Sequence, residues 1–338
     1  METPSGTADY ASVTSDQLDD LSATGLSASD SEGTEAKVQI VLAEFFTVRP
    51  SEIQIQRRLG SGGHADVYEA VWSRKFLVSM SSITVAVKRL KSDLGPVYRD
   101  REALAILTDH PNIVKCFDCT VDQPYLIVNE YCSGGSLFDL LYNFKGGLEL
   151  TVRQRIKILV DVAEGMRYLH EQDPSILHRD LKSSNVLLTK PIRSREQEPF
   201  AKVADFGQAR LSSAATRMTV GVGTTRWMAP EVFDEDDDSA GQYCDSADVY
   251  SFAMLMYETL AGKIPYVETF PDNLDPRIGL HISMGMRPET ASLTDKGIPQ
   301  VVLEYMQRSW DPEPKERPTF RELAEKLLEA CCYLPRQS

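Results

Sequence analysis

The chain contains the stretch His178-Arg179-Asp180-Leu181-Lys182-Ser183-Ser184-Asn185, followed by Asp205-Phe206-Gly207 and then by Ala229-Pro230-Glu231. The first two pieces bring together two carboxylates, an amide and an ammonium group. Carboxylate and amide oxygens are the ligands that Mg²⁺ prefers, and a carboxylate can also accept the proton of a hydroxyl group. We therefore interpret these pieces as parts of one composite site.

A glycine-rich turn lies upstream, in the pattern Gly60-x-Gly62-x-x-Ala65-x-Val67. Ile53 to Gln56 alternates as a strand does, so the turn should join two strands. Glycines without a Cβ let backbone N–H groups approach phosphate oxygens. Turns of this kind are common, so the pattern alone also fits an ordinary hairpin.

Lys88 ends the apolar run Val85-Ala86-Val87-Lys88. An ammonium group on such a strand is costly unless it is paired. Glu102, on a helix predicted over Val97 to Leu107, is the preferred partner. We favour it over Asp100 because Ile106, four residues later, then falls on the core face of that helix.

Residues from about Ser51 to Leu334 resemble a protein kinase domain, and the motifs that carry this resemblance are highly specific. Within the kinases, His178–Asn185, Gly223–Glu231 and Ala247–Glu258 resemble the tyrosine-kinase-like group, which includes Raf-like and mixed-lineage serine/threonine kinases. The resemblance implies an α+β bilobal fold, with a β-rich small lobe carrying one helix and a mostly α-helical large lobe. It also implies ATP and Mg²⁺ as cofactors and transfer of phosphate to Ser/Thr hydroxyls of protein substrates.

The resemblance assigns a role to each site residue. His178–Asn185 becomes the catalytic loop, and Thr224 would bridge Asp180 and Lys182, as in serine/threonine kinases. The catalytic set is Asp180, Lys182, Lys88, Glu102 and Thr224, and the metal ligands are Asn185 and Asp205. The nucleotide-binding set is Gly60, Ser61, Gly62, Gly63, Val67, Ala86, Lys88, Asn129, Glu130, Cys132, Ser136 and Leu187.

Within the nucleotide-binding set, Asn129 falls at the gatekeeper position, where a polar residue is unusual. The C=O of Glu130 and the N–H of Cys132 would meet the adenine edge. Val67, Ala86 and Leu187 would enclose the ring.

Several further residues receive regulatory or structural roles from the same resemblance. Arg179 and Arg210 would bind a phosphate in the activation segment, whose candidate phosphosites are Ser212, Ser213, Thr216 and Thr219. Activation would come from an upstream kinase or from autophosphorylation in trans. An apolar column linking the lobes would comprise Ile106, Cys116, Phe206 and His178. Structural roles are implied for a Glu231–Arg317 ion pair and for Asp248, which would brace the catalytic loop.

The chain divides into three predicted regions. Residues 1–37 are rich in Ser, Thr, Asp and Glu and should form a disordered acidic tail. Residues 38–50 are apolar enough to dock on the small lobe, and residues 51–334 form the kinase domain, with lobes 51–131 and 132–334. Strands are expected at 83–90, around Val114 and at 125–128. Helices are expected at 137–142, 152–170, 246–261, 301–310 and 320–332.

The net charge of −14 argues against binding to nucleic acid or to anionic membranes, and the sequence contains no apolar run long enough to span a bilayer. Six cysteines in 338 residues suit a reducing, cytoplasmic location. Two surface insertions are expected, at Lys190–Phe200 and in the acidic run Asp234–Asp238. The acidic run fits a solvated loop better than a site for a basic partner.

Two other functions remain open on the same fold. A pseudokinase scaffold is favoured by His64, Ala65, Asn129 and Cys116, which depart from the usual residues around the nucleotide. Dual specificity that includes tyrosine is also open, whereas Trp227-Met228 argues against a small-molecule kinase. Ser136 and Ser184 stand where arginine-directed kinases often carry acids, which predicts no strong upstream-arginine preference.

Overall fold

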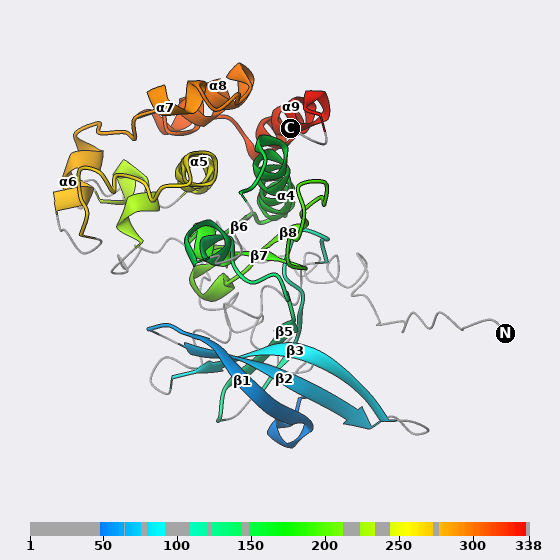
Figure 1. Cartoon of the computed structure of the whole chain (residues 1–338). Helices are drawn as coiled ribbons and strands as arrows, with labels where there is room; N and C mark the ends of the chain where they lie inside the picture. Colours follow the sequence, from blue (N-terminus) through cyan, green and yellow to red (C-terminus); the bar gives the residue numbers. More distant parts are fainter. Residues whose placement is uncertain are drawn as a thin grey trace. The chain divides into compact units, whose positions relative to one another are not determined.

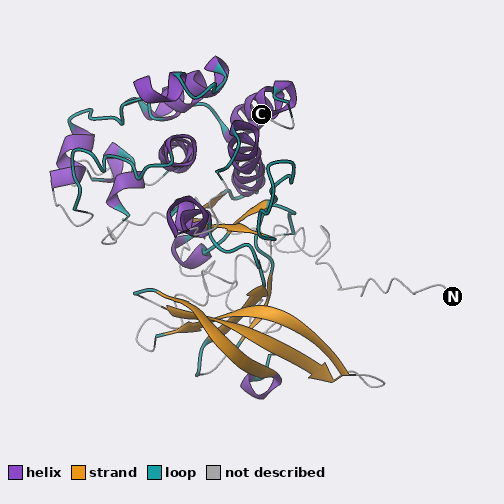
Figure 2. Cartoon of the chain, in the orientation of Figure 1, coloured by secondary structure: helices purple, strands orange, loops and turns teal. Residues whose placement is uncertain are grey.

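The N-terminal part of the described chain is a five-stranded antiparallel sheet in the order β1-β2-β3-β5-β4 (Figure 1). Its strands are β1 Ile53–Ser61, β2 Ala65–Lys75, β3 Met80–Leu90, β4 Cys116–Cys119 and β5 Leu126–Glu130. A short 3₁₀ helix, Pro50–Glu52, precedes β1. Figure 2 shows the long strands gathered in this part and most of the helices in the other, so the predicted β-rich and α-helical lobes are confirmed.

This computed structural model describes residues 48–63, 65–75, 80–91, 109–120, 123–143, 149–211, 224–233, 244–272 and 277–335. All of them belong to the larger of the two units into which the chain divides, Phe45–Ser338. The predictions for the tail, the helix at 97–107, the acidic run and the four candidate phosphosites lie outside the described residues.

The register of the sheet separates an apolar face from the face that carries Lys88. Lys88 pairs with Val67 across β2 and β3, and Ala86 pairs with Asn129 across β3 and β5. Cross-strand partners share a face and neighbours along a strand alternate, so these four side chains lie on one face. The opposite face has its own buried apolar cluster, formed by Val48, Ala70, Trp72, Val85, Val87, Leu126 and Val128.

The strand expected around Val114 begins two residues later, at Cys116. The N–H of Val114 donates instead to the carbonyl of Val203, and the N–H of Val203 donates to the carbonyl of Asn112. These bonds attach the segment before β4 to a strand of the large lobe.

The helices of the large lobe are α4 Val152–His170, α5 Asp245–Ala261, α6 Arg277–Ser283, α7 Ala291–Thr294, α8 Gln300–Ser309 and α9 Phe320–Tyr333. Four of them, α4, α5, α8 and α9, closely match their predicted ranges, whereas α6 and α7 were not predicted. The predicted helix at 137–142 is a short turn with π-helical geometry, Asp139–Asn143. Helix α4 packs against α9 and α5 (Figure 1). Residues Ala247–Ala261 of α5 are all buried, so α5 is the central support of this lobe.

Short strand pairs and 3₁₀ turns hold the loops between these helices. Strand β6 Ile176–Leu177 pairs with β9 Arg210–Leu211, and β7 Val186–Leu188 pairs with β8 Ala201–Val203. The 3₁₀ turns are Ser183–Asn185, Phe206–Gln208, Thr225–Trp227, Pro230–Val232 and Pro314–Glu316.

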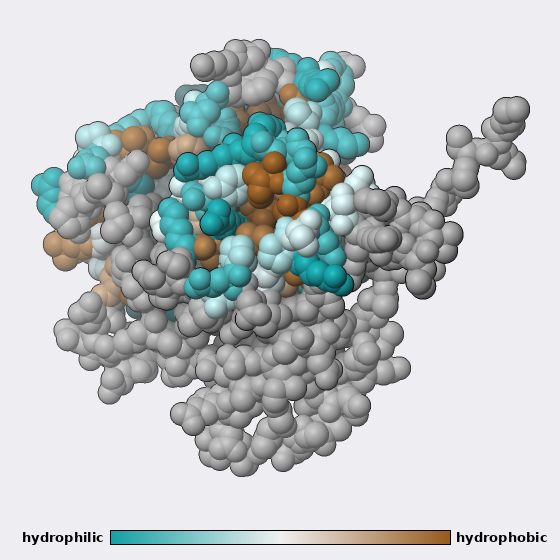
Figure 3. Space-filling view, turned by 90° about the horizontal axis from the view of Figure 1, so that it is seen from below, coloured by the Kyte–Doolittle hydropathy of each residue, from teal (hydrophilic) through white to brown (hydrophobic). Residues whose placement is uncertain are grey.

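Within the described ranges, no helix is long and apolar enough to cross a membrane. The face shown in Figure 3 presents mainly hydrophilic described residues around a patch of hydrophobic ones.

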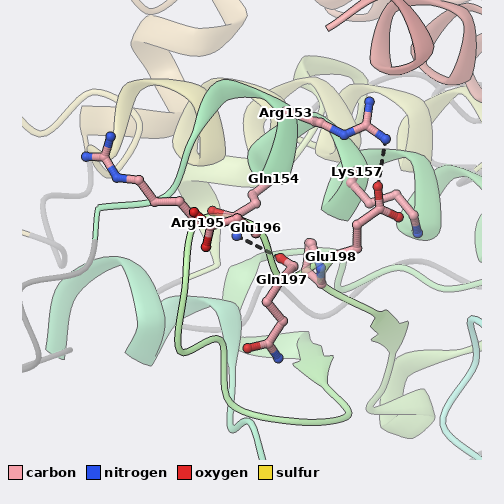
Figure 4. Close-up of a pocket in the computed structure, with 8 residues that line it drawn as sticks. Arg153, Gln154, Lys157, Arg195, Glu196, Gln197 and Glu198 are labelled. Carbon is pink, nitrogen blue, oxygen red and sulfur yellow. Dashed lines mark hydrogen bonds and ion pairs between the residues drawn. The ribbon is translucent and has the colours of Figure 1, made fainter. Parts of the chain in front are cut away.

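The insertion at Lys190–Phe200 connects β7 to β8 and packs against the start of α4 (Figure 4). The Nε2 of Gln154 donates to the carbonyls of Ser194 and Gln197, at 3.0 and 2.8 Å. Arg153 pairs with Glu198 at 2.6 Å. These contacts hold the insertion to the body of the large lobe.

Candidate active site

Asp248, a fully buried carboxylate near the start of α5, binds the backbone of the catalytic loop. Its two oxygens accept the backbone N–H groups of His178 and Arg179 at 2.8 and 2.9 Å, and Oδ2 also contacts His170 Nε2 at 3.0 Å. Arg179 has a φ of +67°, a conformation that side-chain-bearing residues rarely adopt. The bracing role expected of Asp248 matches this geometry.

Four predicted site residues, three in the catalytic loop and Thr224 outside it, are connected by hydrogen bonds. Lys182 Nζ lies 2.8 Å from Asp180 Oδ1 and donates to Thr224 Oγ1 at 2.9 Å. Asn185 Nδ2 donates to the backbone carbonyl of Asp180 at 2.7 Å and to its Oδ2 at 2.9 Å. The Asp180 carboxylate is therefore oriented by an ammonium group on one oxygen and by an amide on the other.

Lys88 on β3 forms an ion pair with Asp205. The Nζ–Oδ1 distance is 2.6 Å, and this ion pair joins β3 of the small lobe to the turn after β8. The side chain of Lys88 is 11% exposed and that of Asp205 is 42% exposed. Asp205 has a φ of +67° and accepts the N–H of Gly207 at 3.3 Å. Glu102 lies outside the described residues.

Asn185 and Asp205 have the chemistry that a Mg²⁺ site needs. Both carry side-chain oxygens, and the N–H of Ala204 donates to the carbonyl of Asn185 at 2.9 Å, which links their two segments. In the described part of the chain, no group of three or more His, Cys, Asp or Glu side chains is arranged to hold a metal. Two protein ligands suit Mg²⁺, which usually keeps waters or substrate phosphates in its coordination shell.

The predicted adenine wall combines both lobes. Val67 and Ala86 share a sheet face with Lys88 and Asn129, and Leu187 on β7 forms an isolated bridge with Ser136. Leu187 also packs against a small buried cluster, which is formed by Val114, Cys132 and Ala204.

Two residues of the predicted hinge have defined surroundings. Glu130 Oε1 accepts the N–H of Lys115 at 2.8 Å and pairs with Lys202 Nζ at 2.5 Å. Burial, with a smaller contribution from Glu130, raises the pKa of the Cys132 thiol to about 12. The Cys132 thiol therefore stays protonated at neutral pH.

The glycine-rich turn is closed by hydrogen bonds that the sequence did not reveal. The N–H of Gly62 donates to the carbonyl of Ala65 at 2.8 Å, and Ser61 Oγ donates to Asp66 Oδ1 at 2.5 Å. A Cβ added at Gly60 or Gly63 would meet nothing within 4 Å. Packing therefore does not demand glycine at these two positions.

The structure also describes members of the predicted apolar column and the predicted Glu231–Arg317 ion pair. The rings of His178 and Phe206 lie 5.5 Å apart, and Cys116 is buried in the same core cluster as Phe206. The guanidinium group of Arg317 donates two hydrogen bonds to the carboxylate of Glu231, at 2.6 and 2.9 Å. Ile106, His64 and the side chain of Arg210 lie outside the described part.

One residue with a part in this site was missed by sequence reasoning. Glu258 is fully buried in α5 and accepts hydrogen bonds from the catalytic loop and from Trp227. Its only sequence signal was an acid in the apolar second half of a helix.

Comparison with known proteins extends over most of the chain. Residues 53–327 match the family model described as protein tyrosine and serine/threonine kinase. Mouse serine/threonine-protein kinase TNNI3K is 34% identical over 311 residues, which cover 90% of this chain and 35% of that protein. Serine/threonine-protein kinase STY46 of Arabidopsis thaliana is 31% identical over 287 residues, covering 85% and 45%.

A third relative, the RGS domain-containing serine/threonine-protein kinase A of Dictyostelium discoideum, is 31% identical over 330 residues, covering 95% and 26%. The chain therefore spans about a third of the length of the TNNI3K relatives, at 35%, 35% and 33%.

Proposed function

Because this chain belongs to the protein tyrosine and serine/threonine kinase family, we propose that it transfers the γ-phosphate of ATP to Ser/Thr hydroxyls of protein substrates. The observation that carries the proposal is that Lys182 and Asn185 both donate to Asp180, while Lys182 also donates to Thr224. A site arranged in this way can orient a hydroxyl group and compensate the negative charge of a phosphoryl group.

Each residue has a distinct task in this proposal. Asp180 orients the substrate hydroxyl and accepts its proton, while Lys182 offsets the charge that develops on the transferred phosphoryl group. Lys88, held by Asp205, binds phosphate oxygens. Asn185 and Asp205 would hold Mg²⁺, which supplies charge neutralisation to the phosphates.

Ser/Thr specificity is supported by the Lys182–Thr224 hydrogen bond of 2.9 Å. The family resemblance supports the same specificity, because dedicated tyrosine kinases usually lack a lysine at the position of Lys182. The printed names of the three relatives above also describe serine/threonine kinases.

The test measures transfer of labelled γ-phosphate from Mg²⁺-ATP to the chain itself and to a generic basic substrate. Label on phosphoserine or phosphothreonine is expected, and it should be lost in Asp180→Asn and Lys88→Met. Asp109→Asn is the matched control, because the Asp109 side chain is 81% exposed and only pairs with Lys115 at 3.4 Å. ATP binding without transfer under any activating condition would favour the pseudokinase alternative.

Regulation through the activation segment is a separate proposal. Arg179 is 6% exposed beside the site, and β9 starts at Arg210, directly before the candidate phosphosites. We infer that phosphate on Ser212, Ser213, Thr216 or Thr219 would bind these two arginines. Mass spectrometry of the active protein should find phosphate on at least one of the four, and activity should fall after phosphatase treatment. Full activity of the unphosphorylated chain would contradict this proposal.

A further inference from the structure

Glu258, near the end of α5, is a fully buried carboxylate on which three side chains converge. Ser183 Oγ donates to Oε1 at 2.5 Å, and Tyr142 OH donates to the same oxygen at 3.3 Å. Trp227 Nε1 donates to Oε2 at 3.0 Å. The three donors come from three different segments of the chain, so Glu258 is the point at which these segments are joined.

Two of these segments also carry Lys182, which pairs with Asp180, and Thr224, which accepts a hydrogen bond from Lys182. Ser183 directly follows Lys182, and Trp227 ends the 3₁₀ turn that follows Thr224. Lys182 and Thr224 are 2.9 Å apart at the site. Glu258 therefore links, from inside the lobe, the two segments of backbone whose side chains, Lys182 and Thr224, meet at the site.

A carboxylate is suited to this task because it offers acceptor sites on both oxygens and has no proton of its own. Burial raises the pKa of Glu258 to about 7, although its donors act against this rise. The backbone N–H of Ser183 is a fourth donor to the same carboxylate. Four donors use the roughly four acceptor sites of a carboxylate, so the O–H of the protonated acid would displace one of them.

Among the described residues, few other charged groups lie on the elements that pack around Glu258. The ionisable groups on the elements packed here include Arg155 on α4, which donates to the carbonyl of Thr259, and Arg226 beside Trp227, which binds carbonyls of Pro265 and Phe270. Lys182 and Asp180 face each other, and Tyr257 lies near Lys263, Glu268 and Glu289. Tyr142 is the titratable group in direct contact, and burial and Glu258 keep its hydroxyl protonated by raising its pKa.

We propose that ionised Glu258 is a positioning residue that holds Ser183 and Trp227 together and thereby brings Lys182 and Thr224 together at Asp180. Glu258 does not touch the substrate. The inference rests on the proposed phosphoryl transfer and adds a residue, and a pH dependence, that the motifs do not contain.

The experiment compares kcat of the full chain with that of Glu258→Gln from pH 6 to pH 8.5. With a pKa of about 7, wild-type kcat should fall about ten-fold from pH 8 to pH 6. In Glu258→Gln this fall should disappear, and kcat at pH 8 should be about ten-fold below wild type. Glu304→Gln, an exposed change on α8, should keep the wild-type profile.

A second readout does not need activity. Trp227 fluorescence, taken as the difference between the wild type and Trp227→Phe, should titrate with a midpoint near 7 in the wild type. That titration should vanish in Glu258→Gln. A wild-type acid limb that survives in Glu258→Gln, or a Trp227 signal that does not titrate, would overturn the assignment. If the wild type transfers no phosphate at any pH, the proposed function fails, and the Trp227 titration alone decides the role of Glu258.

Discussion

Two buried carboxylates on α5 show how donors decide the charge state of a single residue. Burial acts to raise the pKa of Asp248, but His170 and the backbone N–H groups of His178 and Arg179 outweigh it, and the pKa is lowered. Glu258 accepts hydrogen bonds from hydroxyl and indole groups and from the backbone of Ser183 but has no cationic partner like His170, and burial raises its pKa to about 7. Asp248 therefore adds stability above the pKa of an unfolded aspartate, and this contribution is lost in acid.

For Glu258 the pH dependence of stability has the opposite sign. An unfolded glutamate ionises near pH 4.3, so between that pH and about 7 only the unfolded chain releases this proton. The free energy of unfolding should therefore decrease as pH rises through this window, by about 3 kcal/mol in total. Glu258→Gln should equal the wild type at pH 5 and exceed it by up to about 3 kcal/mol at pH 8.

Urea unfolding at the two pH values measures this difference, with Glu304→Gln as the exposed control on α8. If the variant is less stable than the wild type by the same amount at both pH values, ionisation of Glu258 does not lower the free energy of unfolding. If the variant is more stable but less active, the chain keeps this charge for function at a cost in stability.

Sequence reasoning named the residues of the site because its polar groups lie in short motifs. Asp180, Lys182 and Asn185 are neighbours along the chain, and one loop brings their side chains together. The partnership of Lys88 with Asp205 was not predicted, since it depends on how the lobes meet. Glu258 was missed because only the fold shows that it lies under the loop.

At the scale of elements, the predicted helix boundaries were best where the sequence carries a capping motif that marks the start of a helix. Helices α4 and α9 begin after Thr151 and Thr319, each of which forms a capping box with the residue three positions later. Helices α6 and α7 were missed because seven and four residues are too short to display a helical period. The start of β4 was shifted because the backbone of Val114 pairs with Val203, a contact distant in sequence.

The connection from the hinge to Ser136 depends on a close approach at Gly134. Its N–H donates to the carbonyl of Leu188 at 2.9 Å, and a Cβ would lie 2.5 Å from the carbonyl of Lys190 and 2.6 Å from Leu188 Cβ. We expect Gly134→Ala to lower the free energy of unfolding by about 2 kcal/mol and to weaken ATP binding, because Leu187 is displaced with β7.

Denaturant unfolding and calorimetric titration with ATP measure the two effects of Gly134→Ala. Gly63→Ala is the stability control, since its Cβ would meet nothing within 4 Å. Equal stability of the two variants would mean that the segment moves away from β7 at no cost.

At the scale of the molecule, the bilobal fold followed from the order of the motifs, but the contacts that join the lobes did not. Lys88 meets Asp205, and Glu130 of β5 meets Lys202 of β8 at 2.5 Å. Both ion pairs join residues more than 70 positions apart, at separations of 117 and 72. No local pattern marks such pairs, because each depends on the packing of whole elements.

A ligand that engages both lobes should stabilise the whole domain. Mg²⁺-ATP at a hundred times its Kd should add about 2.7 kcal/mol, which raises the Tm of a domain of this size by about 5 °C. Removal of Mg²⁺ with EDTA should reduce the shift, because Asn185 and Asp205 would then act without the ion between them and the phosphates. Asn185→Ala should reduce it likewise.

Asn143→Ala is the matched control for this measurement, since Asn143 is exposed and donates only to Asp139, at 3.0 Å, among the bonds described. Its thermal shift with Mg²⁺-ATP should equal that of the wild type. A shift that persists unchanged both in EDTA and in Asn185→Ala would mean that the nucleotide binds without a metal at these two residues. The site would then resemble a nucleotide sensor, and Asp205 would serve mainly as the partner that draws Lys88 toward the large lobe.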